Sequence, residues 1–223
     1  MQNLLNFLQL DLFPEYFQQK KFKKGEIIFQ SVKSNTITPA FGIVLDGVVT
    51  IESQSNQKTN SYYQLLKNND FFGIELLLEN QPSVTLSYKV TAATQCKVIL
   101  IEQDYLLDHL YAEPKFFHAI LEQISTQYLY LTHRYAIVNG SPTLKLANVM
   151  LDIIRIFDLD TSSASITLPE FISHQILANL AQSSRSRITI ALNDMLKQGI
   201  ITQTRPISIS KIEELRKSST NCR

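Results

Sequence analysis

The chain has 223 residues and a formal net charge of +1, and 44% of its residues are hydrophobic and 18% charged. This composition excludes a disordered or fibrous chain, and the small net charge argues against a non-specific nucleic-acid binder. The charge is unevenly placed, because residues 168–223 carry eight Lys and Arg against four Asp and Glu, whereas residues 1–140 carry eleven against thirteen. A near-neutral body with a basic C-terminal part favours contact between that part and phosphate.

The N-terminal sequence carries no recognisable targeting signal. It lacks the basic segment and cleavage site of a secretory signal, and it lacks the Arg and Ser richness of a transit peptide. No apolar run approaches the roughly 20 residues that span a bilayer, so we expect no membrane partner. The two cysteines, Cys96 and Cys222, are too few for a disulfide framework and favour a reducing compartment. We expect the protein to remain in the compartment where it is made.

Short β-type segments separated by polar residues make up the first half of the chain. They are rich in β-branched and aromatic residues and lie at 26–29, 41–53, 60–66 and 86–102. Asp46-Gly47 lies between two β-rich runs, and this dipeptide predicts a hairpin. Many short strands at this spacing are typical of a β-sandwich or a jelly-roll barrel.

A long amphipathic helix is predicted after Pro114. Its apolar residues repeat in steps of four and three, as in a coiled-coil seam, at Phe117, Leu121, Ile124, Tyr128, Leu131, Tyr135 and Val138. A seam this narrow favours pairing with a second helix, and the alternative is a helix that packs only on its own domain. Gly140-Ser141-Pro142 ends the pattern and predicts a hinge.

The sequence after this break predicts a winged helix-turn-helix. An amphipathic helix at 143–157 is followed by a polar loop, and then by two helical segments joined by a tight polar turn within 172–199. Two short β-type pieces at 200–203 and 206–210 predict a β wing, and 211–217 predicts a closing helix. A helix-turn-helix of this kind places its second helix in the DNA major groove.

Two complementary faces support the helix-turn-helix interpretation. The positions expected to pack between the helices are small or apolar, and they are Leu177, Ala178, Ala181, Ile188, Ala191, Leu192 and Met195. Ser173 is expected to cap the first helix, and Ser183 or Ser184 the second. Gln182 lies in the turn, where Gly would be favoured, and it carries a modest conformational cost.

The outward face of the second helix carries the predicted DNA contacts. We expect Arg185 to read a guanine edge through O6 and N7, and Ser184 and Arg187 to contact phosphates. Ser186 or Thr189 is expected to meet base edges or thymine methyl groups. In the first helix, His174 is a candidate phosphate contact.

The order of these parts resembles the cyclic-AMP receptor and fumarate-nitrate regulator (Crp/Fnr) superfamily. That resemblance implies an α+β fold with an effector-type β-roll at 1–113, a dimerisation helix and hinge at 114–140, and a winged helix-turn-helix DNA-binding domain at 141–223. It also implies a homodimer on double-stranded DNA, with RNA polymerase as a further partner. The tripeptide SHQ at 173–175, together with Arg185 and Ile188-Thr189, looks most like the global nitrogen regulators of cyanobacteria and red-algal plastids. This resemblance implies a location in a bacterial cytosol or, for a plastid-encoded chain, in the stroma.

The segment FFGIELLLEN at 71–80 is similar to the opening of the superfamily's effector cassette. It implies an effector pocket that includes Gly73, Ile74, Glu75 and Lys89. The resemblance implies cyclic AMP or 2-oxoglutarate as the effector, but the positions of the binding arginines hold other residues, at about Leu86, Thr126 and Leu131. A dicarboxylate with no facing Arg would be poorly held, so neither effector is expected. The N-terminus has no cysteine cluster, and no metal site is expected.

The function predicted from the residues and the resemblance is a sequence-specific transcription regulator that acts as a homodimer on a palindromic site. Nitrogen control is implied by the resemblance alone, and activation or repression is left open. The family's second base-reading Arg falls at Ile190, which offers only apolar contact and predicts an altered DNA site. The alternative is a small-molecule sensor or protein-interaction module with a degenerate helix-turn-helix, favoured by Gln182 and Ile190. An enzyme is not expected, because the histidines are scattered, at His109, His118, His133 and His174.

Overall fold

A computed structural model describes residues 2–8, 14–30, 40–53, 63–77 and 87–220 of the chain. The chain divides into two compact units, Met1–Thr126 and Gln127–Arg223. The division falls within the longest helix, α3 (Lys115–Ala136), so each unit contains part of that helix. Among the described residues, none of the helices is both long enough and apolar enough to cross a membrane.

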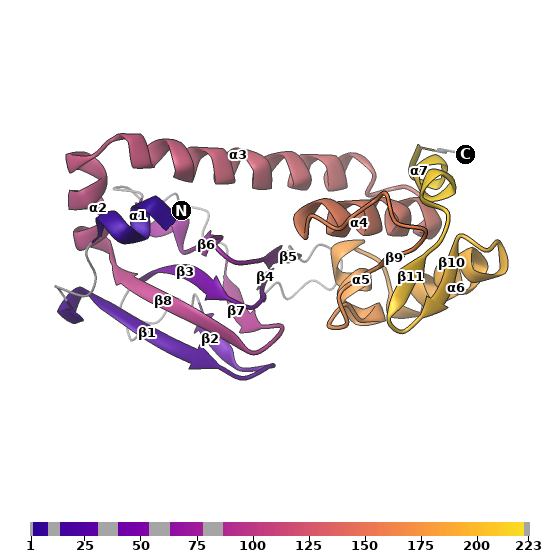
Figure 1. Ribbon diagram of the computed structural model, residues 1–223, viewed down its shortest axis with the longest axis horizontal. Coiled ribbons are helices and arrows are strands. Elements are labelled where there is room, and N and C mark those ends of the chain that lie inside the picture. The colour runs from indigo at the N-terminus through magenta and orange to yellow at the C-terminus, as the bar shows by residue number, and fades with distance from the viewer. Residues whose placement is uncertain (1, 9–13, 31–39, 54–62, 78–86, 221–223) are drawn as a thin grey trace. The chain divides into compact units, whose positions relative to one another are not determined.

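The first unit contains two four-stranded antiparallel sheets (Figure 1). One sheet has the order β1-β8-β3-β6, formed by Phe17–Phe22, Cys96–Glu102, Ala40–Asp46 and Phe71–Phe72. The other has the order β2-β7-β4-β5, formed by Ile27–Gln30, Tyr88–Ala92, Val49–Ser53 and Tyr63–Leu66. The predicted β-roll of many short strands is therefore confirmed.

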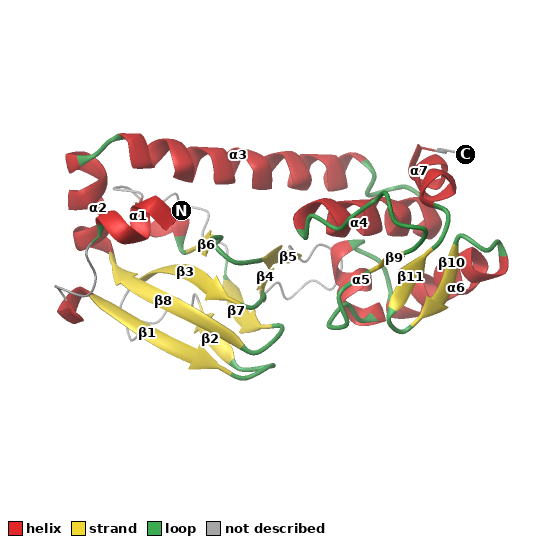
Figure 2. Cartoon of the chain, viewed as in Figure 1, coloured by secondary structure: helices red, strands yellow, loops and turns green. Residues whose placement is uncertain are grey.

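Alternation along β8 shows how the sequence builds this unit. Cys96 and Val98 belong to an apolar core that both sheets share, whereas Ile99 and Ile101 belong to a second core on the opposite face of the strand. Successive strand residues point to opposite faces, so a strand with apolar residues at nearly every position is covered on both sides. Figure 2 shows the helices that lie beside these strands in the first unit.

Helices cover the outer face of the β8 sheet. Leu4 and Leu8, at α1 (Gln2–Phe7), and Leu106 and Leu110 of α2 (Gln103–Ala112) are buried in the second core. The first turns of α3 contribute to the same core through Phe116 and Ile120, and Phe41 and Tyr105 are also buried in it. Two short 3-10 helices, Pro14–Tyr16 and Ile74–Leu77, complete the described elements of this unit.

The prediction of a hairpin at Asp46-Gly47 is wrong. The strands on either side, β3 and β4, belong to different sheets and do not pair with each other. Gly47 does adopt the expected left-handed conformation, with φ of 84°. A Cβ at this position would lie 2.4 Å from the Gln95 carbonyl oxygen, so the glycine lets the chain turn tightly from one sheet to the other.

The second unit is a winged helix-turn-helix. Its elements are α4 (Pro142–Ile156), β9 (Ile166–Thr167), α5 (His174–Leu180), α6 (Arg185–Lys197), β10 (Ile201–Thr204), β11 (Ile207–Ile209) and α7 (Ile212–Thr220). The predicted wing is confirmed, and β9 adds a third strand to it in the order β10-β11-β9. Ser141 caps α4, and Pro142 occupies its first turn, where a missing N–H costs nothing.

Candidate nucleic-acid interface

The two helices of the motif begin at serine caps, as predicted. The hydroxyl of Ser173 accepts a hydrogen bond from the Ile176 amide at 3.2 Å, and that of Ser184 accepts one from the Arg187 amide at 3.3 Å. Each cap satisfies one of the amide groups that a helix leaves free in its first turn. The sequence left Ser183 and Ser184 open as the second cap, and the structure selects Ser184.

The turn between α5 and α6 is a Schellman motif. The Ser183 amide donates to the Ala178 carbonyl at 3.0 Å, and the Gln182 amide donates to the Asn179 carbonyl at 3.2 Å. Gln182 has φ of 46°, a left-handed conformation that glycine adopts without strain. The conformational cost expected from this residue is therefore present in the turn.

The inward face of the motif is confirmed in full. Leu177, Ala178, Ala181, Ile188, Ala191, Leu192 and Met195 are all buried. Small side chains at Ala178 and Ala181 let the helices approach closely, and the branched and long side chains of α6 fill the space beyond them. This packing fixes which side of α6 faces away from the protein.

The exposed N-terminal part of α6 is basic and hydroxyl-rich. Arg185, Ser186 and Arg187 are all exposed, and the Ser184 hydroxyl lies 3.1 Å from that of Ser186. An α-helix N-terminus carries partial positive charge and free amide groups, and two arginines add to this field. The surface is therefore suited to a polyanion, and the predicted contacts of these residues remain predictions.

Thr189 and His174 lie together between the helices. The Thr189 hydroxyl donates to the Arg185 carbonyl at 2.9 Å and lies 3.1 Å from His174 Nδ1. His174 is only 9% exposed, and burial, together with the charges of Arg205 and Arg185, lowers its pKa against an opposing effect of the Thr204 backbone. This geometry favours a packing role for His174 over the predicted phosphate contact.

Lys145 of α4 joins this basic surface, and sequence reasoning missed it. Burial and the nearby positive charge of Arg187 lower the pKa of the Lys145 ammonium group. Lys145 also lines the same pocket as Gln182, which lies in the turn just before α6. Only its place on an otherwise apolar stretch of α4 could have signalled it.

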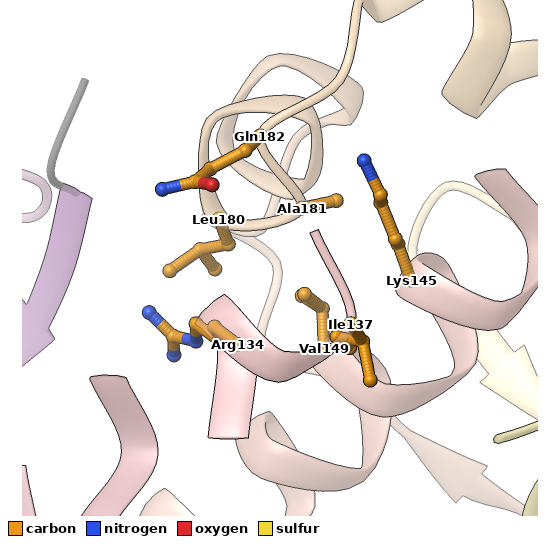
Figure 3. Close-up of a pocket in the computed structure, with 7 residues that line it drawn as sticks. All are labelled: Arg134, Ile137, Lys145, Val149, Leu180, Ala181 and Gln182. Carbon is orange, nitrogen blue, oxygen red and sulfur yellow. The ribbon is translucent and has the colours of Figure 1, made fainter. Parts of the chain in front are cut away.

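A small, partly open pocket adjoins the turn (Figure 3). Its walls combine aliphatic side chains with three polar ones, and they are formed by Arg134, Ile137, Lys145, Val149, Leu180, Ala181 and Gln182. The pocket lies within the second unit, between the end of α3, the start of α4 and the turn that joins α5 to α6. Its small size leaves space for little beyond solvent.

A buried ion pair joins α3 to α4 beside this pocket. Arg134 Nε lies 3.5 Å from Asp152 Oδ2, and Arg155 Nη1 lies 3.5 Å from Asp152 Oδ1. The Asp152 carboxyl group is buried, and burial raises its pKa against the lowering effects of Arg134, His133 and Arg155. The end of the predicted dimerisation helix is thereby fixed to the core of the second unit.

The predicted seam lies on α3 as an exposed apolar stripe. Five of its residues are exposed in the single chain, namely Leu121, Ile124, Tyr128, Leu131 and Tyr135. Phe117 is half-buried against the core of the first unit, and Val138 lies just beyond the helix end. A stripe of this kind is characteristic of a helix that is covered by a partner.

The predicted effector residues have partners within the chain. Glu75 accepts a hydrogen bond from the Tyr88 hydroxyl, and Lys89 Nζ lies 3.1 Å from Glu52 Oε2. Gly73 has φ of 82°, and Ile74 packs against the second core. Leu86, at the position of the family's arginine, lies outside the described residues, and the role of the whole pocket stays a prediction.

The first unit contains no arginine, the side chain that best binds phosphate and carboxylate groups. The first arginine of the entire chain is Arg134, so residues 1–133 contain no guanidinium group with which to grip a phosphate or a dicarboxylate. Among the residues that the structure describes, no group of three or more His, Cys, Asp or Glu side chains could hold a metal ion.

A β-roll followed by a long helix and a winged helix-turn-helix with a basic face defines a class of protein, the two-domain DNA-binding regulators. The family model of the cyclic nucleotide-binding domain matches residues 19–111, and that of the Crp-like helix-turn-helix domain matches residues 144–218. With these two domains in this order, the chain belongs to the Crp/Fnr family of regulators. No curated protein sequence matches the chain significantly.

Several solved structures share this fold over nearly the whole chain. A cyclic nucleotide-binding domain protein from Listeria monocytogenes is 16% identical with a TM-score of 0.74, covering 95% of this chain and 97% of its own. FixK2 from Bradyrhizobium japonicum is 16% identical with a TM-score of 0.71, and the match covers 93% of this chain and 99% of FixK2. The c-di-GMP-responsive global regulator CLP of Xanthomonas campestris is 16% identical with a TM-score of 0.72, covering 94% and 99%. At this identity the likeness establishes the fold.

Proposed function

We propose that the protein is a transcription regulator that binds a two-fold symmetric DNA site as a homodimer. The observation that carries the proposal is the N-terminal part of α6, where Arg185, Ser186 and Arg187 are exposed on a helix whose opposite face is fully buried. A rigid helix with basic and hydroxyl side chains at its free end fits the major groove.

Within this surface the side chains have different proposed roles. Arg185 donates to O6 and N7 of a guanine, because a guanidinium group matches both acceptors at once. Ser184, Arg187 and Lys145 contact phosphates and fix the register of α6 on the duplex. Ser186 contacts a base edge. The Thr189 hydroxyl instead donates a hydrogen bond to the Arg185 carbonyl within α6.

The homodimer is supported by the stripe on α3. A second copy of the same helix would cover Leu121, Ile124, Tyr128 and Leu131, which a single chain leaves exposed. Two copies related by a two-fold axis would present two α6 helices to half-sites about one helical turn apart. Each copy would therefore read one half of a palindrome.

Selection from a random duplex library, followed by affinity measurement on the selected sequence, tests the proposal. Arg185→Ala should weaken binding by about 1–3 kcal/mol and relax the preference at one base pair per half-site. Lys197→Ala, at the far end of α6 and 79% exposed in its side chain, is the matched control and should retain the preference. No enrichment of any sequence, or equal effects of both variants, would contradict the proposal.

A second candidate function is supported by Ile190. This exposed side chain on α6 gives the surface an apolar character that a protein partner could also use. A sensor or interaction module with a degenerate helix-turn-helix would still dimerise, but it would show no salt-dependent affinity for duplex DNA. The same library experiment therefore separates the two functions.

The physiological signal is a separate part of the proposal. The resemblance of 173–175, Arg185 and Ile188-Thr189 to nitrogen regulators favours nitrogen control as the first context to test. The absence of arginine before Arg134 argues against cyclic AMP or 2-oxoglutarate held in the family's manner. A thermal-shift screen with both compounds measures this directly, since a ligand of the native state raises the unfolding temperature.

A further inference from the structure

We propose that Ile190 reads the 5-methyl group of a thymine, and thereby specifies one thymine in each half-site. The inference rests on the proposed DNA-binding function and deepens it, since it names the base that α6 recognises beyond Arg185. Ile190 is the one apolar side chain that is exposed in the middle of an otherwise polar face of α6.

The position of Ile190 is unusual within α6. It is 60% exposed, whereas the other exposed residues between Ser184 and Asn193 are all polar. Ser186, Ile190 and Asn193 are spaced by four and three residues, so they lie along one face of the helix. This face runs from the basic N-terminal end of α6 toward its middle.

The core of the second unit does not account for this side chain. The buried residues of α6 are Ile188, Ala191, Leu192 and Met195, which occupy the opposite side of the helix. The neighbouring Thr189 hydroxyl is engaged by the Arg185 carbonyl and by His174. The middle of the outward face therefore presents an aliphatic group to whatever α6 binds.

The chemistry of the major groove then limits what Ile190 can recognise. All four bases show hydrogen-bond donors or acceptors there, and thymine alone adds a methyl group. An aliphatic side chain placed over a donor or acceptor would remove water from it without replacing the hydrogen bond. Against a thymine methyl group, the same side chain buries apolar surface on both partners.

Replacement of thymine by uracil tests the inference, because it removes only the methyl group and leaves the base pair intact. In the selected duplex, each thymine of one half-site is replaced by uracil in turn. For the wild-type protein, one replacement should weaken binding about three- to fivefold, the expected effect of one buried methyl group. For Ile190→Ala, the same replacement should have no effect.

Two further variants make the outcome specific. Ser186→Ala lies on the same face, and it should retain the uracil penalty even if its overall affinity falls. Ile190→Arg should exchange the selected thymine for a guanine, because a guanidinium group pairs with O6 and N7. Ile190 is exposed, so circular dichroism should show the wild-type melting temperature for these variants within about 2 °C.

The possible results distinguish the inference from the function on which it rests. If no duplex is bound specifically, the proposed function itself fails. If the protein binds a specific duplex but no thymine is sensitive to uracil, the function stands and the inference is overturned. An equal uracil penalty in wild-type protein and in Ile190→Ala would also overturn it, since another group would then contact the methyl.

Discussion

At the scale of single residues, the turn of the helix-turn-helix gives the first prediction. Gln182 has φ of 46°, where a side chain is strained and glycine is not. Gln182→Gly should therefore raise the free energy of unfolding, or at least leave it unchanged, with a gain of up to about 1 kcal/mol. Urea denaturation followed by circular dichroism measures the change.

Gln198→Gly is the control for this substitution. Gln198 caps the end of α6 with φ of −77°, so glycine relieves no strain there and adds freedom to the unfolded chain. The control should lower the free energy of unfolding. A loss of stability in Gln182→Gly equal to that of the control would show that the turn is not strained.

His174 gives a prediction about pH. Its pKa lies below 6.5 in the folded protein, mainly because the ring is buried, and the unfolded chain therefore binds a proton first as the pH falls. The stabilising contribution of the neutral ring is present above pH 6.5 and is lost as the pH falls through the folded pKa. The unfolding temperature should decrease more steeply between pH 7.5 and 5.5 in the wild-type protein than in His174→Gln.

His118→Gln provides the comparison for that titration. His118 is an exposed histidine of α3, so this variant shows what the loss of a histidine does when no buried ring is removed. If His174→Gln keeps the full wild-type slope, the buried ring is not the group that responds to pH.

Residue-level expectations succeeded where the information is local. The caps at Ser173 and Ser184 and the spacing of inward residues such as Ile188 follow from short-range helix rules, and these positions could be predicted. The burial of His174 and the approach of Lys145 to Arg187 depend on elements far apart in the chain. No short-range rule could have placed them.

At the scale of elements, α3 carries the prediction for assembly. Leu131→Glu places a charge in the seam and should convert the proposed dimer into a monomer, because a buried carboxylate without a partner is strongly disfavoured. Sedimentation equilibrium measures the mass. Leu129 is 67% exposed against 42% for Leu131, but it lies outside the four-three repeat.

Leu129→Glu is therefore the matched control for the seam. In an isolated chain the two substitutions would be equivalent, since both side chains are exposed on the same helix. Only a partner that covers the seam distinguishes them. A dimer in both variants, or a monomer in the wild-type protein, would exclude this face as the interface.

The ion pair between α3 and α4 gives a second prediction at this scale. Arg134→Met leaves the buried Asp152 carboxylate without its most buried partner and should lower the free energy of unfolding by about 3 kcal/mol. The double variant Arg134→Met/Asp152→Leu should recover most of that loss, because no charge remains buried. Chemical denaturation of the single and double variants measures both effects.

Arg155→Met is the control, because Arg155 lies at the same distance from Asp152 but its side chain is 62% exposed. Solvent screens an exposed pair, so this variant should lose less than about 1 kcal/mol. Losses of similar size for Arg134→Met and Arg155→Met would mean that burial does not set the strength of this pair.

The elements themselves were predicted unevenly, for a physical reason. The long helix, the helix-turn-helix and the wing have strong periodicity or clear end signals, and they were confirmed. Asp46-Gly47 predicts a hairpin, but the same dipeptide occurs in other tight turns. Here it joins two sheets, because β3 and β4 pair with other strands. Helices α1 and α2 were not predicted, since they are short and their burial depends on the β8 sheet.

At the scale of the whole molecule, the two units carry different chemistry. Residues 1–133 contain no arginine, whereas all seven arginines of the chain lie at position 134 or later, and two of them, Arg185 and Arg187, belong to the first turn of α6. The exposed basic start of α6 could be predicted because its residues are contiguous in the sequence, and its contacts with DNA stay a prediction. The effector site could not, because such a pocket is assembled from several strands and its family arginines are replaced here.

Footprinting tests the central claim, that two copies of this chain read one symmetric DNA site. The wild-type protein should protect a palindrome whose half-sites lie about one helical turn, or about 10 base pairs, apart. Leu131→Glu and Arg185→Ala should each reduce that protection at concentrations where the wild-type protein gives it fully. Protection of a single asymmetric site that is insensitive to both substitutions, or no protection at all, would contradict the account.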